Sequence, residues 1–169
     1  MDDLIKRDDL YYKKFSDVPY TGKIEGLWSY TNSEVQGSFK DGKKAGTWLY
    51  YWKKGQLKSK GNFKNDKKEG IWIGYWGNGK LRDKMNMING NREGSMSTYD
   101  ENETLRFKGN FKNDKKEGLT LRYSGYGKLL ERGNYINDKR NGTWIIYNQD
   151  GTLNIKFSRT YKNGKKISE

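Results

Sequence analysis

The clearest pattern along the chain is a 24-residue recurrence of aromatic, glycine and basic positions. The ten residues from Gly61 to Gly70 return unchanged at Gly109 to Gly118. Half of that 48-residue separation also aligns the sequence between them, so five copies fill residues 37–156 without a gap. A fixed period of this length is typical of repeat architectures whose units stack on one another. The copies start at Gly37, Gly61, Met85, Gly109 and Gly133.

Alternation of side chains within each copy predicts short strands. In residues 57–64, Gly61 and Phe63 fall on one face together with the leucine, and three lysines fall on the other. The glycine leaves bare backbone over which a neighbouring Trp or Tyr ring can lie. The next strand is less regular, because Trp72 and Tyr75 are three residues apart. That spacing predicts either a bulge or rings on both faces.

Two glycine positions mark the turns of each copy. The tenth residue is always Gly and follows an Asn/Asp-rich pair and two mostly basic residues, which predicts a tight turn with positive φ. The nineteenth residue is Gly in four copies and predicts a hairpin turn. The tenth-position glycines are Gly46, Gly70, Gly94, Gly118 and Gly142, and those at the nineteenth are Gly55, Gly79, Gly127 and Gly151.

Large apolar residues recur in step with the repeat and are predicted to form its core. Position twelve is Trp in three copies, and Met96 and Thr120 replace it in the other two. Position three is aromatic except for Met87. The predicted core residues are Trp48, Trp72 and Trp144 at position twelve, Tyr51, Tyr75, Tyr99, Tyr123 and Tyr147 at position fifteen, and Leu57, Leu81, Leu105, Leu129 and Leu153 at position twenty-one.

Together these elements predict an all-β fold, an elongated antiparallel meander of tandem 24-residue β-hairpins. Residues 1–36 are expected to form an N-terminal cap that includes a truncated copy at 22–30. Residues 37–156 hold the five copies, and residues 157–169 form a C-terminal partial copy or cap. Open ends of such an array expose strand edges, so self-association through the end strands is an alternative.

Charge adds a candidate binding feature. The chain has 34 Lys and Arg against 21 Asp and Glu and a net charge of +13, and its mean hydropathy of -1.18 would by itself favour disorder. Thirteen Tyr, six Trp and six Phe supply the ring area for a core instead. Positions eight and twenty-four are always basic, which predicts two ladders with about 10 Å between copies. These residues are Lys44, Lys68, Arg92, Lys116 and Arg140 at position eight, and Lys60, Lys84, Lys108, Arg132 and Lys156 at position twenty-four.

Such ladders suit anionic lipid, nucleic-acid phosphates or an acidic protein surface. The alternative is that the lysines only keep the sheet soluble and its edges unpaired. Stacking of bases on the rings is a weaker interpretation than core packing, so nucleic acid is not an expected partner. The third copy also concentrates three methionines, Met85, Met87 and Met96, which form a candidate partner patch or fill gaps left by a missing Trp and Gly.

Candidate chemistry for catalysis is sparse. The chain has no His and no Cys, and its Asp, Glu, Lys and Tyr mostly occupy repeated positions. No Walker loop or dinucleotide fingerprint occurs. We therefore expect no enzyme, and we assign no catalytic residue, cofactor site or metal site.

The repeat pattern G-x-[FY]-K-[ND]-[GD]-K-K-x-G-x-W-x-x-Y-x-x-x-G-x-L resembles the MORN-variant repeat of bacterial proteins grouped as YwqK-like antitoxins. Residues 9–22 look like the segment that precedes the repeats in many of them. The resemblance implies a protein-recognition module, the antitoxin or immunity partner of a toxin, with anionic phospholipid binding as the alternative. The third copy departs from the pattern, with Met85 and Glu103 for Gly and Met96 for Trp.

Location remains open at this level. No stretch approaches the roughly 18 apolar residues that span a bilayer, and the first residues are acidic rather than basic and apolar like a secretion leader. The chain as written is expected in the cytoplasm. It is expected in the cell envelope or periplasm if a leader has been removed.

Overall fold

The computed structural model describes residues 3–28 and 33–167, and all regular elements within these ranges are strands. The strands are β1 (Leu4–Arg7), β2 (Leu10–Lys13), β3 (Gly22–Trp28), β4 (Ser33–Lys40), β5 (Lys43–Tyr51), β6 (Leu57–Lys64), β7 (Lys67–Tyr75), β8 (Leu81–Ile88), β9 (Asn91–Tyr99), β10 (Leu105–Lys112), β11 (Lys115–Lys116), β12 (Gly118–Tyr123), β13 (Leu129–Ile136), β14 (Lys139–Ile146), β15 (Arg159–Lys162) and β16 (Lys165–Ile167).

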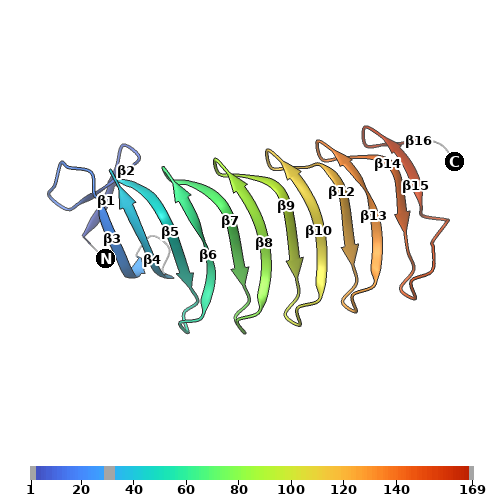
Figure 1. The fold of residues 1–169 in the computed structure, drawn as a ribbon, viewed down its shortest axis with the longest axis horizontal. Coiled ribbons are helices and arrows are strands. Elements are labelled where there is room, and N and C mark those ends of the chain that lie inside the picture. The colour runs from blue at the N-terminus through green and yellow to red at the C-terminus, as the bar shows by residue number, and fades with distance from the viewer. Residues whose placement is uncertain (1–2, 29–32, 168–169) are drawn as a thin grey trace. The chain divides into compact units, whose positions relative to one another are not determined.

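Fourteen of these strands pair in one antiparallel sheet that follows chain order from β3 to β16, with β11 beside β10 (Figure 1). Strands β1 and β2 form a separate two-stranded sheet. The predicted all-β meander of tandem hairpins is therefore confirmed. The chain divides into two compact units, residues 1–80 with 87–90 and residues 81–86 with 91–169, which we call the first and second units.

The turn between β6 and β7 shows why each copy carries an Asn or Asp at position five followed by an Asp or Gly at position six. Asn65 and Asp66 have φ values of 51° and 63°, which is the conformation of a two-residue type I′ hairpin. Gly70 also has a positive φ of 69°, as predicted, but it lies inside β7. The pairing of β6 with β7 shifts register beside it. The turn predicted at the tenth-position glycine is therefore a bulge, and the turn itself is five residues earlier.

At the opposite ends of the strands, the connecting loops are five residues long. In the first copy the backbone N–H of Trp52 donates to the carbonyl of Gln56 at 2.8 Å, and that of Gly55 donates to the carbonyl of Trp52 at 2.9 Å. Gly55 has φ 82°, as the predicted hairpin turn requires. In the third copy Glu103 takes the same position with φ 66°.

Tryptophan lies directly over glycine in the copies that keep both residues. A Cβ added to Gly61 would lie 2.2 Å from Cδ2 of Trp72, so only a bare backbone fits there. The indole N–H of Trp72 donates to the carbonyl of Asn62 at 3.1 Å, and the Phe63 ring meets the indole edge-on, with centroids 5.1 Å apart. Gly37 with Trp48 and Gly133 with Trp144 repeat this arrangement. The predicted stacking of rings on bare backbone is confirmed.

The tryptophans are the centre of the core, and the other predicted core residues lie around them. Trp48, Trp72 and Trp144 are buried, whereas the tyrosines at position fifteen and four of the leucines at position twenty-one are half-buried. Leu153 departs from the predicted placement, since its side chain is 52% exposed.

The first copy shows how a strand accommodates a Trp at position twelve and a Tyr at position fifteen, three residues apart. In the first copy a register shift falls between Tyr50 and Tyr51. The Tyr51 hydroxyl donates to Gln36 Oε1 at 3.1 Å, on the face of the sheet away from Trp48. In that copy both alternatives hold, because the strand has a bulge and both faces carry rings.

The N-terminal hairpin covers the first copy's core. Tyr11 lies with its ring centroid 4.7 Å from that of Phe39, and the Gly42 N–H donates to the carbonyl of Tyr20 at 2.9 Å. These contacts join the N-terminal residues to the first copy, and their role as a cap stays a prediction. Residues 29–30 of the predicted truncated copy lie outside the described ranges.

Candidate binding face of the sheet

The two faces of the sheet differ in chemistry. We call the side that carries the tryptophans and the rings at position three the aromatic face, and the side that carries positions two, thirteen and twenty-four the polar face. Residues that pair directly across two strands share a face, so the register assigns each basic position to one of them.

The basic residues at position eight lie on the aromatic face. Lys68 pairs directly with Phe63, and its Nζ lies 4.3 Å from the centroid of the Trp72 ring. The attraction of a cation to a ring face, together with the apolar stem of the side chain, covers the core. The equivalent contacts join Lys44 to Trp48 at 4.6 Å, Arg92 to Phe111 at 4.2 Å, Lys116 to Tyr135 at 4.8 Å and Arg140 to Trp144 at 4.1 Å.

The backbone of position eight is also bonded to the following copy. The Lys44 N–H donates to Asp66 Oδ1 at 2.8 Å, and the Asp66 N–H donates to the Lys44 carbonyl at 3.1 Å. Burial lowers the pKa of the Lys44 ammonium. The pairs Arg92 with Asp114 and Lys116 with Asp138 repeat both bonds. Position eight is thus committed to joining copies, and the Asp at position six was not recognised from sequence as its partner.

The basic residues at position twenty-four that belong to strands, Lys60, Lys84, Lys108 and Arg132, lie on the polar face, whereas Lys156 lies in the turn before β15. Lys60 pairs with Leu49 on one side and Ile73 on the other, and in the second unit Lys108 and Arg132 both pair with Leu121. Cations and aliphatic side chains therefore alternate across neighbouring strands. Four of the five are exposed and Lys60 is half-buried.

The cations of position twenty-four differ from those of position eight in their partners. Among the described residues no ion pair involves Lys60, Lys84, Lys108, Arg132 or Lys156. By contrast, Arg92 pairs with Asp114 at 2.9 Å and Arg140 with Glu131 at 3.4 Å. The sequence pattern treats both basic positions alike, whereas the structure leaves only one of them available to a partner.

Exposed aliphatic side chains accompany the cations on the polar face. Leu119 is 49% exposed and pairs with Asn134, and Ile136, two residues further along that strand, is 43% exposed. In the first unit Ile71 and Ile88 occupy the same repeat positions and are exposed as well. A partner on this face would meet both charge and apolar surface.

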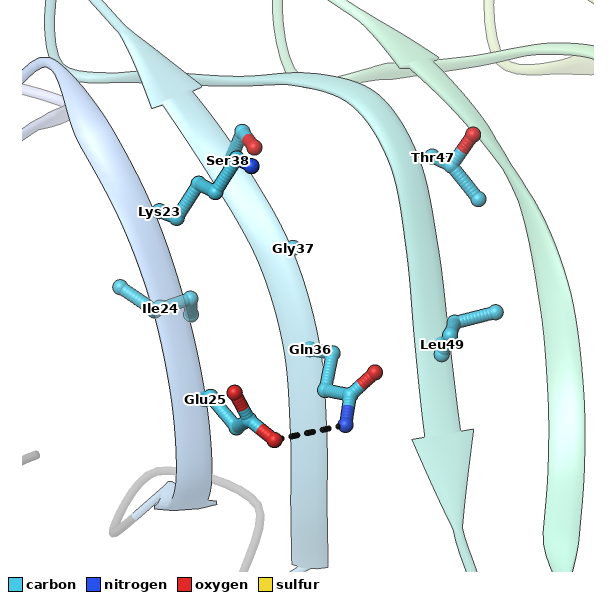
Figure 2. A pocket seen from close by; sticks show the side chains of 8 residues that line it. All are labelled: Lys23, Ile24, Glu25, Gln36, Gly37, Ser38, Thr47 and Leu49. Carbon is cyan, nitrogen blue, oxygen red and sulfur yellow. Dashed lines mark hydrogen bonds between the residues drawn. The ribbon is translucent and has the colours of Figure 1, made fainter.

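A shallow depression of about 420 Å³ lies on the first unit over β3, β4 and β5. Figure 2 shows that Glu25 and Gln36 face each other there, and Gln36 Nε2 donates to Glu25 Oε1 at 3.0 Å. Lys23 and Leu49 also line it. Glu25 and Gln36 lie in the same cross-strand row as Lys60. Toward β3 this row therefore carries an acidic and an amide side chain in place of cations.

The three methionines of the third copy do not form an exposed patch. Met87 is 5% exposed, and Met85 and Met96 are half-buried. Their burial favours the alternative that they fill the space left by a missing Trp and Gly.

No group of three or more His, Asp or Glu side chains suited to a metal ion occurs in residues 3–28 and 33–167. Over the same part of the chain, no helix is long and apolar enough to cross a membrane.

Comparison with known families matches the MORN repeat variant to residues 44–65, 68–89 and 92–113. Each matched segment runs from position eight of one copy to position five of the next. Repeats of this family are often protein- or membrane-binding modules, and the fold is typically non-catalytic. No curated protein matches the chain.

Proposed function

We propose that this chain is a non-catalytic protein-recognition module whose polar face binds an acidic surface on a partner protein. The observation that carries the proposal is the contrast between the two basic positions. Position eight is used inside the repeat, where its cations cover rings. The cations of position twenty-four are exposed, apart from the half-buried Lys60, and form no ion pairs among the described residues. Unpaired cations on one face raise the rate and specificity of binding to an acidic surface.

The arrangement on the polar face favours a protein over a simple polyanion. Leu121 lies between Lys108 and Arg132, so a partner has to offer apolar area between its acidic groups. Interface cores combine buried apolar contacts with a charged rim in this way. Phosphate chains alone would leave the aliphatic residues uncovered.

The partner class we propose is a toxin that this chain neutralises, which makes it an antitoxin or immunity protein. Support comes from the likeness of the repeats and of residues 9–22 to YwqK-like antitoxins, and from the family match to three copies. An extended sheet face suits this role, since neutralisation requires covering a surface and needs no catalytic group.

The test compares two charge reversals of equal size. The full chain is used to recover its partner from a lysate of the source cells, and affinity for the purified partner is then measured by calorimetry. We expect the double substitution Lys108→Glu with Arg132→Glu to weaken binding at least tenfold. The control Lys53→Glu with Lys54→Glu changes the net charge equally in an exposed loop and should change affinity less than twofold. Equal effects of both pairs would refute the polar face as the binding surface.

A second candidate function is docking on an anionic membrane. Exposed Ile71 and Leu119 beside the cations favour it, because apolar insertion and charge attraction together bind peripheral proteins to lipid. Flotation with vesicles that contain phosphatidylserine separates the two functions. Lipid binding should be lost by about 0.5 M salt, because charge attraction is screened. A protein interface with buried aliphatic contacts should survive moderate salt.

A further inference from the structure

The loop between β2 and β3 presents two apolar side chains to solvent at its tip. Phe15 is fully exposed, at 103%, and Val18 is 73% exposed. Lys13 and Lys14 precede them and are exposed as well. A phenylalanine normally contributes to a folded chain by burying its ring, and a fully exposed one makes no such contribution.

Phe15 also has an unusual backbone conformation, with φ 62°. Bulky side chains rarely adopt positive φ, and Gly, Asn or Asp normally occupy such positions. Of the other non-glycine residues with positive φ in the described chain, all are Asp or Asn except Glu103. Neither packing nor backbone preference therefore explains a phenylalanine at this point of the loop.

Hydrogen bonds hold the loop in this conformation. The Lys14 N–H donates to the Asp3 carbonyl at 2.6 Å, and the Val18 N–H donates to Ser16 Oγ at 3.2 Å. The Arg7 guanidinium donates to the Ser16 carbonyl and forms an ion pair with Asp17 at 3.2 Å. The backbone on both sides of Phe15 is thus held by Asp3 and by Arg7 of β1, so the loop has little backbone freedom left to lose on binding.

We infer that Phe15 is an apolar anchor that inserts into a pocket on the partner protein, a step that rests on the proposed recognition function. A few aromatic side chains that become fully buried in partner pockets contribute much of the binding energy at protein interfaces. The only acidic side chain at the tip, Asp17, is already paired with Arg7, so Lys13 and Lys14 set the local charge. The pocket that fits this tip is apolar with an acidic rim.

A membrane fits the loop less well than a protein pocket. One phenylalanine and one valine offer little area for insertion into a bilayer, and lipid accepts a side chain in any conformation. A fixed and strained backbone brings a benefit only where the receiving surface has a matching shape.

The first experiment replaces Phe15 with the photo-crosslinking residue p-benzoylphenylalanine in the full chain. A matched chain carries the same residue in place of Tyr126, another exposed loop aromatic, which is 94% exposed. Both are irradiated in a lysate of the source cells, and the adducts are identified by mass spectrometry. We expect position 15 to give one predominant acidic protein that position 126 does not give. Equal adducts at both positions, or lipid adducts at position 15, would overturn the inference.

The second experiment uses the crosslinked protein in purified form. Phe15→Gly should weaken its binding at least tenfold, while the thermal midpoint of the free chain stays the same or rises, because glycine accepts positive φ without strain. Tyr126→Ala should change affinity less than twofold. Unchanged affinity of Phe15→Gly would overturn the anchor.

The two proposals fail in distinguishable ways. If Phe15→Gly abolishes binding and the polar-face reversal at Lys108 and Arg132 has no effect, the anchor stands and the proposed binding face is wrong. If the reversal weakens binding and Phe15→Gly does not, the binding face stands and the anchor is wrong.

Discussion

The second and fourth copies solve the same packing problem with different residues. In the second copy Trp72 lies flat over the bare backbone of Gly61. In the fourth copy Thr120 replaces the Trp, and the glycine, Gly109, is covered by Thr120 and by Phe107 from position twenty-three of the third copy. The requirement that the repeat imposes is therefore a large side chain over the glycine, and its origin along the chain can change.

The third copy changes both partners at once. Met85 stands where the other copies have Gly, and Met96 stands where three of them have Trp. A side chain at the first position is allowed once no indole lies on it. The pairing of Gly with Trp and of Met with Met indicates that the two positions act as one packing unit.

The largest expected effect is the loss of stability when a side chain is placed under an indole. Gly61→Ala puts a Cβ 2.2 Å from the fused ring of Trp72, and we expect the unfolding free energy to fall by about 3 kcal/mol. Gly109→Ala meets the ends of Phe107 and Thr120 at 2.8 Å, which can move, so about 1 kcal/mol is expected. Urea denaturation followed by tryptophan fluorescence measures both.

A double substitution checks that the indole causes this loss. With Trp72→Ala already present, the further cost of Gly61→Ala should nearly vanish, because the atom that it meets is gone. Additive costs in the double variant would contradict the packing unit.

A somewhat smaller effect tests whether Phe107 stands in for a tryptophan. Phe107→Ala uncovers Gly109, so we expect a loss of about 2 to 3 kcal/mol of stability. Ser59 holds the same repeat position in the first copy, where Trp48 and Trp72 cover the glycines. Ser59→Ala should therefore cost less than about 0.5 kcal/mol. Equal losses of stability in Phe107→Ala and Ser59→Ala would refute the idea that the Phe107 ring takes the place of a tryptophan.

The sequence predicts the contact between ring and glycine because both residues recur in register. It does not predict the cover over Gly109, since Phe107 occurs at position twenty-three in one copy only. The sequence also does not predict on which face of the sheet each basic position lies, because the bulge at Gly70 and the adjoining turn break simple alternation. Phe15 was not identified as a site residue, since its strained φ depends on bonds to Asp3 and Arg7, which are remote in sequence.

Alkaline pH should distinguish the aromatic face of the first unit. Burial raises the pKa of Tyr50 to about 12 from its ordinary value of 10.0. A raised folded-state pKa gives stability that is present below pH 10 and is lost as pH rises toward about 12. Lys44 acts in the opposite sense, but its lowered pKa has no further effect above its ordinary 10.5. The position of Tyr50 is held by Arg122 and Ile146 in the fourth and fifth copies, so the second unit lacks this phenol.

We expect Tyr50→Phe to reduce the fall in thermal midpoint between about pH 10.5 and 12. Circular dichroism melts over this range measure the change. A pH profile identical to that of the parent chain would show that ionisation of Tyr50 is not coupled to folding.

The smallest expected effect concerns the loops, where the comparison between copies extends to position sixteen. Ser124 Oγ accepts from the N–H groups of Tyr126 and Lys128 at 3.2 and 3.1 Å, which completes the loop of the fourth copy. Trp52 holds that position in the first copy, and its buried Nε1 has no hydrogen-bond partner, the one such side-chain atom in the described chain. An unsatisfied buried donor lowers stability.

Trp52→Phe keeps a ring below the Lys58 ammonium, which lies 4.7 Å from the Trp52 centroid, and removes the donor. Relief of the unsatisfied N–H should raise the unfolding free energy by up to about 1 kcal/mol, reduced by the weaker attraction of a cation to phenylalanine. Trp76→Phe is the matched change in the second copy, where the indole nitrogen is not a buried atom without a partner, and it should be neutral or destabilising. A loss of stability in Trp52→Phe as large as in Trp76→Phe would mean that the indole N–H of Trp52 is satisfied by water in solution. The hydrogen bonds of the loops in the first and fourth copies would then be equally complete, and the two loops would differ only in the half-buried ring of Trp52.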